Sequence, residues 1–123
     1  VETVFITEAG ISFDARIDTG AESSSIHAKD ISVLDAGQIS FVLSNQTGEK
    51  RLIHAVVDSV VRVRNAEGSS LRYKVALTVR RHGQEKTVLF TLKERSDMRY
   101  RVLLGRNWLR GDYIVDVDRK PSE

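Results

Sequence analysis

The sequence predicts an all-β fold, on the basis of its apolar pattern, its turn chemistry and its composition. Short apolar runs rich in Val and Ile recur along the chain, and turn-forming residues separate them at regular intervals. Hydrophobic residues make up 41% of the chain and charged residues 29%, as in ordinary globular domains. At 123 residues the chain is long enough for one core and too short for two lobes. We therefore expect a single domain over residues 1–123.

The first half of the chain is expected to form two hairpins. Residues 4–6 and 11–17 flank a turn at residues 8–10. Residues 41–53 then contain two apolar runs around Asn-Gln-Thr-Gly-Glu, whose Asn and Gly suit the positive φ values of a tight reversal.

The second half begins with a longer hairpin. Residues 56–64 and 71–79 alternate apolar and polar side chains around a polar tip at residues 65–70. The remaining expected elements are a turn at 81–84, a strand at 86–92, a short strand at 101–104, one short helix near residues 106–111 and a last strand at 113–117.

Composition and charge exclude several classes of function. The chain has no Cys, so disulfide frameworks, thiol catalysis and Cys-based metal sites are excluded. No run of about 18 apolar residues occurs, so we expect no membrane insertion by this segment. The first residue is Val1 rather than Met, which leaves open that an N-terminal portion has been removed, and a cytoplasmic and a periplasmic location are both compatible.

A net charge of +2 is too small to imply a nucleic-acid partner, and we expect none. The basic residues of the longer hairpin and of the strand end that follows it alternate with apolar ones, which favours solvated strand faces, and aromatic residues are sparse among them. These basic residues are Arg62, Arg64, Arg72, Lys74, Arg80 and Arg81.

Two short segments carry the chemistry. Residues 15–21 read Ala-Arg-Ile-Asp-Thr-Gly-Ala, which places Asp18 at the end of an apolar strand and small residues directly after it. Taken alone, Asp-Thr-Gly is a weak signal, because three turn residues recur by chance in many chains. Residues 102–109 read Val-Leu-Leu-Gly-Arg-Asn-Trp-Leu, an apolar strand followed by Gly, Arg and the start of a helix.

This pair of segments resembles the retropepsins, the homodimeric aspartic proteases typified by retroviral enzymes. A closer resemblance is to the bacterial family labelled ATP-dependent zinc proteases, which is retropepsin-like despite that label. The matching residues are 15–21, 24–28, 102–109 and 115–117, so the likeness spans nearly the whole chain. The resemblance implies a retropepsin-like small, partly closed β-barrel that acts as a homodimer on a peptide or protein substrate.

The chemistry of such a site needs two carboxylates. At about 3 Å they cannot both ionise and so share one proton, as in the well-known aspartic-protease dyads. The ionised partner activates a water, and the protonated partner hydrogen-bonds the peptide carbonyl. Because the chain has one Asp-Thr-Gly, the second carboxylate must come from Asp18 of another copy across a two-fold axis. Neither a metal nor another cofactor is expected.

The resemblance also assigns supporting roles. It implies that the Thr19 hydroxyl locks the two active-site loops together, and that Arg106 pairs with Glu22, where retroviral enzymes have Asp. A flap is expected at the tip of the longer hairpin, with the hairpin at residues 39–55 as the alternative. The expected site comprises the catalytic Asp18, Thr19 and Gly20, the substrate-binding Ala21, Asn65, Ala66, Glu67, Gly68 and Ser69, and the supporting Glu22 and Arg106.

Other sites are less favoured. The three histidines show neither a His-Glu-x-x-His motif nor a close pairing with carboxylates, so a zinc site is disfavoured, and His27 is expected to pack near the site or to make a structural hydrogen bond. The serines at residues 23–25 lack a nucleophile elbow and favour a strand start. The alternative function is a catalytically silent retropepsin-like module that binds peptides or regulates.

Overall fold

The computed structural model describes residues 2–94 and 99–109 of the chain. In these residues strands dominate, and none of their helices has the length and apolar character needed to cross a membrane. The elements are β1 (Glu2–Ile6), β2 (Ile11–Ile17), β3 (Ser24–His27), β4 (Lys29–Val33), the 3-10 turn η1 (Asp35–Gly37), β5 (Gln38–Ser44), β6 (Lys50–Asn65), β7 (Gly68–Arg81), β8 (Gln84–Lys93), β9 (Val102–Leu104) and the helix α1 (Arg106–Leu109).

Alternation of apolar and polar residues builds the core. In β7, Val75, Leu77 and Val79 are fully buried, whereas Ala76 between them is exposed. The same period of two places one face of each barrel strand inside. The largest fully buried side chains include Phe13, Phe41, Phe90, Ile6, Ile26 and Leu104.

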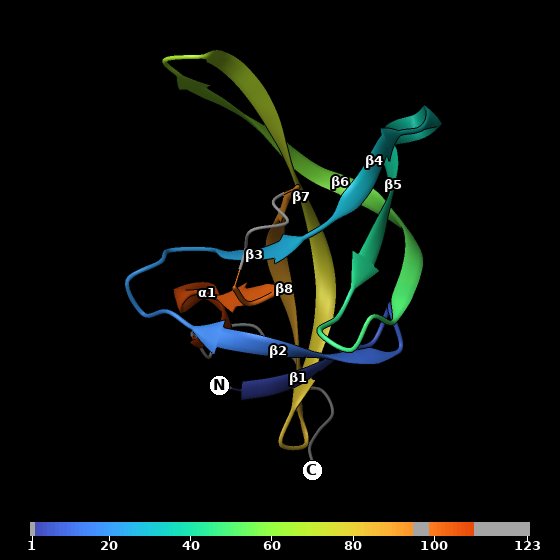
Figure 1. Cartoon of the computed structure of the whole chain (residues 1–123), viewed down its shortest axis with the longest axis vertical. Coiled ribbons are helices and arrows are strands. Elements are labelled where there is room, and N and C mark those ends of the chain that lie inside the picture. Colours follow the sequence, from blue (N-terminus) through green and yellow to red (C-terminus); the bar gives the residue numbers. More distant parts are fainter. Residues whose placement is uncertain (1, 95–98, 110–123) are drawn as a thin grey trace.

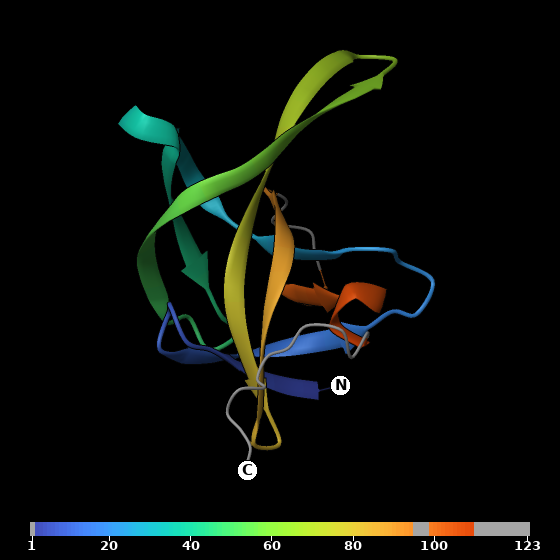
Figure 2. The ribbon, with the colours of Figure 1, turned by 180° about the vertical axis from the view of Figure 1, so that it is seen from behind.

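Six strands close a β-barrel in the order β1-β2-β9-β3-β8-β7 (Figures 1 and 2). Antiparallel pairing of β1 with β7, through Phe5↔Arg80 and Ile6↔Val79, joins the two ends of the sheet. β9 lies between β2 and β3, parallel to β2 and antiparallel to β3. A segment near the end of the chain is therefore inserted between two strands from its beginning.

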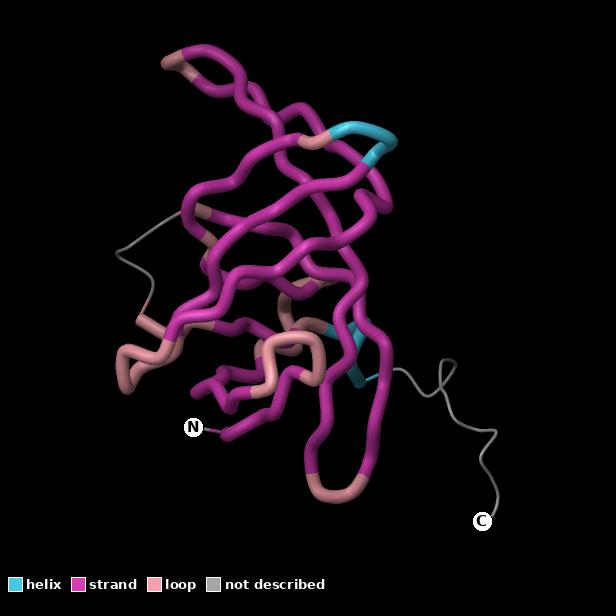
Figure 3. The backbone as a smooth tube through the Cα atoms, turned by 90° about the vertical axis from the view of Figure 1, so that its right-hand side faces the viewer, coloured by secondary structure: helices cyan, strands magenta, loops and turns pink. Residues whose placement is uncertain are grey.

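The strands β4, β5 and β6 form an extension beside the barrel (Figures 1 and 3). The first part of β6 pairs with β5, from Lys50↔Ser44 to Val56↔Gln38, and the rest pairs with β7. The β6–β7 hairpin continues beyond the barrel and ends in a two-residue connection between Asn65 and Gly68.

The expected all-β barrel with one short helix is confirmed. All of the expected hairpins are present, and the serine run does begin a strand, β3. The sequence did not predict β4 or η1, and the expected last strand at 113–117 lies outside the described residues. The helix is described from Arg106 to Leu109, within the range expected for it.

Candidate active site

Asp18 follows directly after the last residue of β2. In the parallel pairing of β2 with β9, Ile17 lies opposite Leu104, and the backbone N–H of Asp18 donates to the Leu104 carbonyl at 2.9 Å. The strand pairing therefore fixes the point at which the chain leaves the barrel. In Figure 1 the loop from Asp18 to β3 extends to the left of the barrel.

The loop turns tightly after Asp18. The Asp18 carboxylate accepts a hydrogen bond from the Gly20 N–H at 2.9 Å, and the Asp18 carbonyl accepts one from the Ala21 N–H at 3.1 Å. A Cβ on residue 20 would lie 3.3 Å from the Asp18 carboxylate oxygen, so glycine leaves that oxygen uncrowded. The Asp18 side chain is half-buried, and Thr19 and Gly20 are exposed.

The helix α1 holds the loop from one side. The Arg106 N–H donates to the Ala21 carbonyl at 2.8 Å, and the Asn107 N–H donates to the Glu22 carbonyl at 3.3 Å. The Arg106 guanidinium forms an ion pair with Glu22 at 2.5 Å and also donates to the Thr19 carbonyl at 3.3 Å. The ion pair expected from the sequence is present, and it connects both sides of the turn to the helix.

Gly105 lies directly beneath the loop. A Cβ at this position would lie 2.4 Å from the Ser23 carbonyl oxygen and 2.8 Å from the Ala21 carbonyl oxygen, closer than real Cβ atoms approach other atoms. The loop backbone therefore packs on the backbone of residue 105, which only glycine permits.

A buried hydroxyl completes the support. Ser24 is fully buried, and its Oγ accepts a hydrogen bond from the Gly105 N–H at 3.0 Å. The same hydroxyl donates to Asn107 Oδ1 at 2.6 Å, and Asn107 Nδ2 donates to the Leu89 carbonyl at 3.0 Å. Sequence reasoning assigned no role to Ser24 or Asn107. Asn107 lies within the Leu-Leu-Gly-Arg-Asn segment and Ser24 within residues 24–28, and the family resemblance of these two segments was the available signal.

The two candidate flaps differ in their surroundings. The β5–β6 connection is anchored to β2, because Asn45 Nδ2 donates to the Ser12 carbonyl at 2.9 Å and the Asp14 N–H donates to Gln46 at 3.0 Å. Ser12 and Asp14 lie on β2 well before the Asp18 loop. The β6–β7 tip is exposed and, in Figure 1, extends beyond the barrel at the top of the view, leaning toward the left, the side on which the Asp18 loop lies.

At this tip the Glu67 N–H donates to the Asn65 side chain at 3.0 Å, which stabilises the turn. Among the described residues, no hydrogen bond joins the tip to the Asp18 loop. The structure thus brings Asp18–Glu22 together with Arg106, and it leaves the expected flap residues 65–69 apart from them within one chain.

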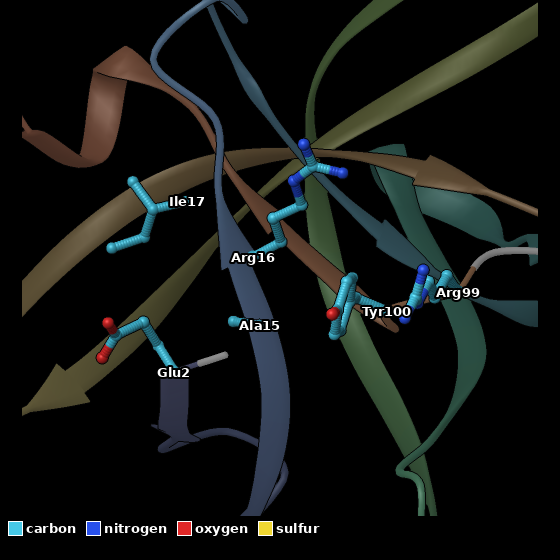
Figure 4. A pocket seen from close by; sticks show the side chains of 6 residues that line it. All are labelled: Glu2, Ala15, Arg16, Ile17, Arg99 and Tyr100. Carbon is cyan, nitrogen blue, oxygen red and sulfur yellow. The ribbon is translucent and has the colours of Figure 1, made fainter.

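A hollow of about 380 Å³ lies beside the base of the Asp18 loop (Figure 4). Its lining includes Ile17, the residue before Asp18, together with Arg16, Arg99 and Tyr100. The Arg99 guanidinium lies 5.7 Å from the centre of the Tyr100 ring. The sequence analysis did not predict this hollow, because its residues come from distant segments that the pairing of β2 with β9 brings together.

The acidic residue of the hollow is already paired. Glu2 accepts hydrogen bonds from Arg81 at 2.6 and 3.1 Å, and this hydrogen-bonded guanidinium holds the pKa of the Glu2 carboxyl below its usual range. Arg16 and Arg99 are the other charged residues in the lining of the hollow.

The histidines are dispersed. His27, on β3, is buried, whereas His54 and His82 are exposed. Burial lowers the pKa of His27, and the positive charge of Arg101 lowers it further. Among residues 2–94 and 99–109 no three His, Asp or Glu side chains are grouped as metal ligands would be.

Comparison with known proteins agrees with this geometry. The profile of the RimB-like family, described as retropepsin-like aspartic endopeptidase RimB, matches residues 1–123. A crystal structure of protein Lpg0085 from Legionella pneumophila, of unknown function, superposes with a TM-score of 0.72 at 25% identity, covering 86% of this chain and 80% of that one.

Longer relatives contain a similar segment. Proteins of Shewanella pealeana and Shewanella halifaxensis, each described as a probable alpha-L-glutamate ligase, are 35% and 34% identical over 116 residues. The match covers 89% of this chain and 24% of each relative, so the chain spans about a quarter of their length. Since the family profile matches the whole sequence, the chain belongs to the RimB-like family of retropepsin-like aspartic endopeptidases.

Proposed function

We propose that two copies of this chain form an aspartic endopeptidase in which the two Asp18 carboxylates share one proton and activate one water. The observation that carries the proposal is the Asp18 loop itself. Its backbone is fixed by β9 and α1, while Asp18, Thr19 and Gly20 remain accessible. A rigid support beneath an accessible carboxylate is the arrangement that positioned acid–base chemistry requires.

A second copy supplies what one chain lacks. One Asp-Thr-Gly segment provides one carboxylate, whereas general acid and general base must both be present at the scissile bond. A two-fold axis beside the loop would place the same residue on both sides of the peptide, because an isologous contact repeats every group. We propose that Thr19, exposed next to Asp18, links the two loops across this axis.

The two identical carboxyl groups then take different roles in the reaction. The ionised Asp18 removes a proton from the bridging water as the water attacks the carbonyl carbon, and the protonated Asp18 donates a hydrogen bond to the carbonyl oxygen. Collapse of the tetrahedral intermediate breaks the C–N bond, and the carboxyl that received the water's proton supplies it to the leaving nitrogen. After this step the two Asp18 carboxyl groups together hold one proton again.

Substrate contacts are proposed at the β6–β7 hairpin and at the hollow beside the loop. Residues 65–69 form the exposed tip of the hairpin, and closure of this tip over a bound peptide would exclude water. Ala21 follows the catalytic tripeptide and would contact the peptide backbone.

The charge of the hollow favours acidic substrates. Arg16 and Arg99 line it, and its one carboxylate, Glu2, is held by Arg81. A Glu or Asp side chain of a peptide would therefore pair with these two guanidinium groups. The longer relatives are described as probable alpha-L-glutamate ligases, and glutamate carries the negative charge that these guanidinium groups would bind, which supports the same proposal.

The experiment compares the substitution Asp18→Asn with the matched control Asp14→Asn, which changes a carboxylate on β2, before the loop begins. Cleavage of a broad peptide library near pH 5 would fall by about a hundred- to ten-thousandfold in Asp18→Asn, as expected for loss of an acid–base group. Asp14→Asn would retain it. Specific activity would also rise with protein concentration, because only the dimer is active.

The competing function is peptide binding without cleavage. A silent module would bind library peptides equally well with Asp18 or Asn at position 18, and it would release no new amino termini at any concentration. That outcome, in folded protein shown to be dimeric, would overturn the endopeptidase proposal.

A further inference from the structure

We infer that Asn107 is a positioning residue that acts through Ser24 to hold the Asp18 loop in register with β9. The inference rests on the proposed function for its catalytic consequence. Its structural part rests on a buried hydrogen bond from the Gly105 N–H to Ser24 and a partly buried one from Ser24 to Asn107, each between residues more than eighty positions apart in the sequence.

The direction of every bond in this chain is determined. The Gly105 N–H can only donate, so Ser24 Oγ accepts from it and directs its own proton to Asn107 Oδ1. The Leu89 carbonyl can only accept, so it receives the Asn107 Nδ2 proton. Each group therefore has one orientation, and hydrogen bonds in such a chain strengthen one another.

These side-chain hydrogen bonds continue the connection between β3 and the β9 segment beyond the point where their backbone pairing ends. β9 has three residues and pairs with β3 only through Ser25↔Leu103 and Ile26↔Val102. Beyond Val102 and Leu103, the Ser24 hydroxyl provides the next connection, to the N–H of Gly105. Asn107 then links that hydroxyl to Leu89 on β8, the other neighbour of β3.

Both ends of the loop are thereby hydrogen-bonded to β9 or to the residue that follows it. At one end the Asp18 N–H donates to the Leu104 carbonyl, and at the other Ser24 accepts from Gly105. Without Asn107 the Ser24 proton would lose its acceptor, and the second end would be less firmly held. In a two-fold site both loops would be displaced in the same way, and a displacement of a catalytic group by about 1 Å can reduce a rate a hundredfold.

The test measures the loop directly. In hydrogen–deuterium exchange of the full chain, Asn107→Ala is expected to increase exchange in peptides covering residues 18–24 by about tenfold, the scale of one lost hydrogen bond. Ser24→Ala should do the same, and the double variant should add little, because the two residues act as one unit. Ser25→Ala, which removes a buried hydroxyl from the next position of β3, is the matched control.

Catalysis supplies the second readout. Asn107→Ala should lower kcat about ten- to a hundredfold with little change in KM, since the loop and not the peptide-binding surface is disturbed. Ser24→Thr keeps the hydroxyl, so residues 18–24 of this variant should exchange as slowly as those of the wild type. If Ser24→Ala does not fold, Asn107→Ala alone decides, because its side chain is only half-buried.

Failure of this inference is distinguishable from failure of the proposed function. Unchanged exchange at residues 18–24 in Asn107→Ala would overturn the positioning role even if the wild-type protein cleaves peptides. Faster exchange in a protein that cleaves nothing would support the positioning role and count against the endopeptidase.

Discussion

Replacement of Gly105 by alanine tests whether the Asp18 loop packs on the backbone of the β9–α1 junction. The new methyl group would lie 2.4 Å from the Ser23 carbonyl oxygen, 2.7 Å from its carbon and 2.8 Å from the Ala21 carbonyl oxygen. All three are main-chain atoms, so no side-chain rotation relieves the contact. Gly105 does not have a left-handed φ, so the conformation itself suits alanine and the clash is the cause of any effect.

The magnitude follows from the displacement needed. Real Cβ atoms essentially never approach within 3.0 Å, so the Ser23 oxygen must move from 2.4 to at least 3.0 Å, a shift of 0.6 Å. Overpacking of this kind costs about 1–3 kcal/mol. The shift also weakens the bond from the Gly105 N–H to Ser24, worth about 1 kcal/mol. We expect Gly105→Ala to lower the free energy of unfolding by about 2–4 kcal/mol.

Urea denaturation measures this loss, and Gly20→Ala is the control. A Cβ on residue 20 would lie 3.3 Å from a side-chain oxygen of Asp18 in an exposed turn, so stability should change by less than about 1 kcal/mol while peptide cleavage falls. An unfolding midpoint of Gly105→Ala equal to that of the wild type, at an unchanged slope, would refute the packing of the loop on this glycine.

Three further perturbations are expected to lower the stability of the fold by different amounts. Glu22→Gln should lower the free energy of unfolding by less than about 1 kcal/mol, because its ion pair with Arg106 is largely exposed, and a larger loss in urea denaturation would contradict this. Asn45→Ala should lower the free energy of unfolding by about 2–4 kcal/mol, because the buried Asn45 side chain forms hydrogen bonds with Ser12, Thr47 and Glu49. The control Gln46→Ala, at an exposed residue, should lower it by less than about 1 kcal/mol in the same assay. Stability should fall as the pH drops below about 6.5, because burial holds the pKa of His27 lower in the folded state and the unfolded chain takes up the proton first. The decline between pH 7 and 5.5 should shrink in His27→Gln, and an identical decline in both proteins would show that His27 is not its source.

The hairpins were predictable because their signals are local. Each has apolar strand residues on both sides of a turn whose residues favour reversal, so no distant contact is needed to recognise it. β4 and η1 have weaker signals. β4 is mostly exposed and shows no alternation, and Asp30 inside it has a left-handed φ of 52°. The reversal after β4 uses left-handed conformations at Ala36 and Gly37, with φ of 61° and 72°, and Gly37 by itself did not identify the turn.

The candidate site was predictable only in part, for a related reason. Asp18 and the contact between Glu22 and Arg106 follow from two recognisable segments. The roles of Ser24 and Asn107 depend on the insertion of β9 between β2 and β3, which joins residues 83 positions apart. Nothing in the local sequence of a serine run or of a helix start contains that information. The same insertion brings Arg99 and Arg16 to one hollow.

The Asp18 loop has a supported side and an accessible side, and this separates two kinds of variant. Gly105, Ser24 and Asn107 hold the loop from within the chain, so changes there should alter both the free energy of unfolding and the rate of cleavage. Thr19 and Gly20 are exposed in one chain, so changes there should leave the fold intact. Under the proposed mechanism the second copy and the substrate cover these two residues. A substitution at Thr19 that reduced dimer formation and cleavage together, at unchanged stability of the single chain, would identify the accessible side of the loop as the place where the two copies meet.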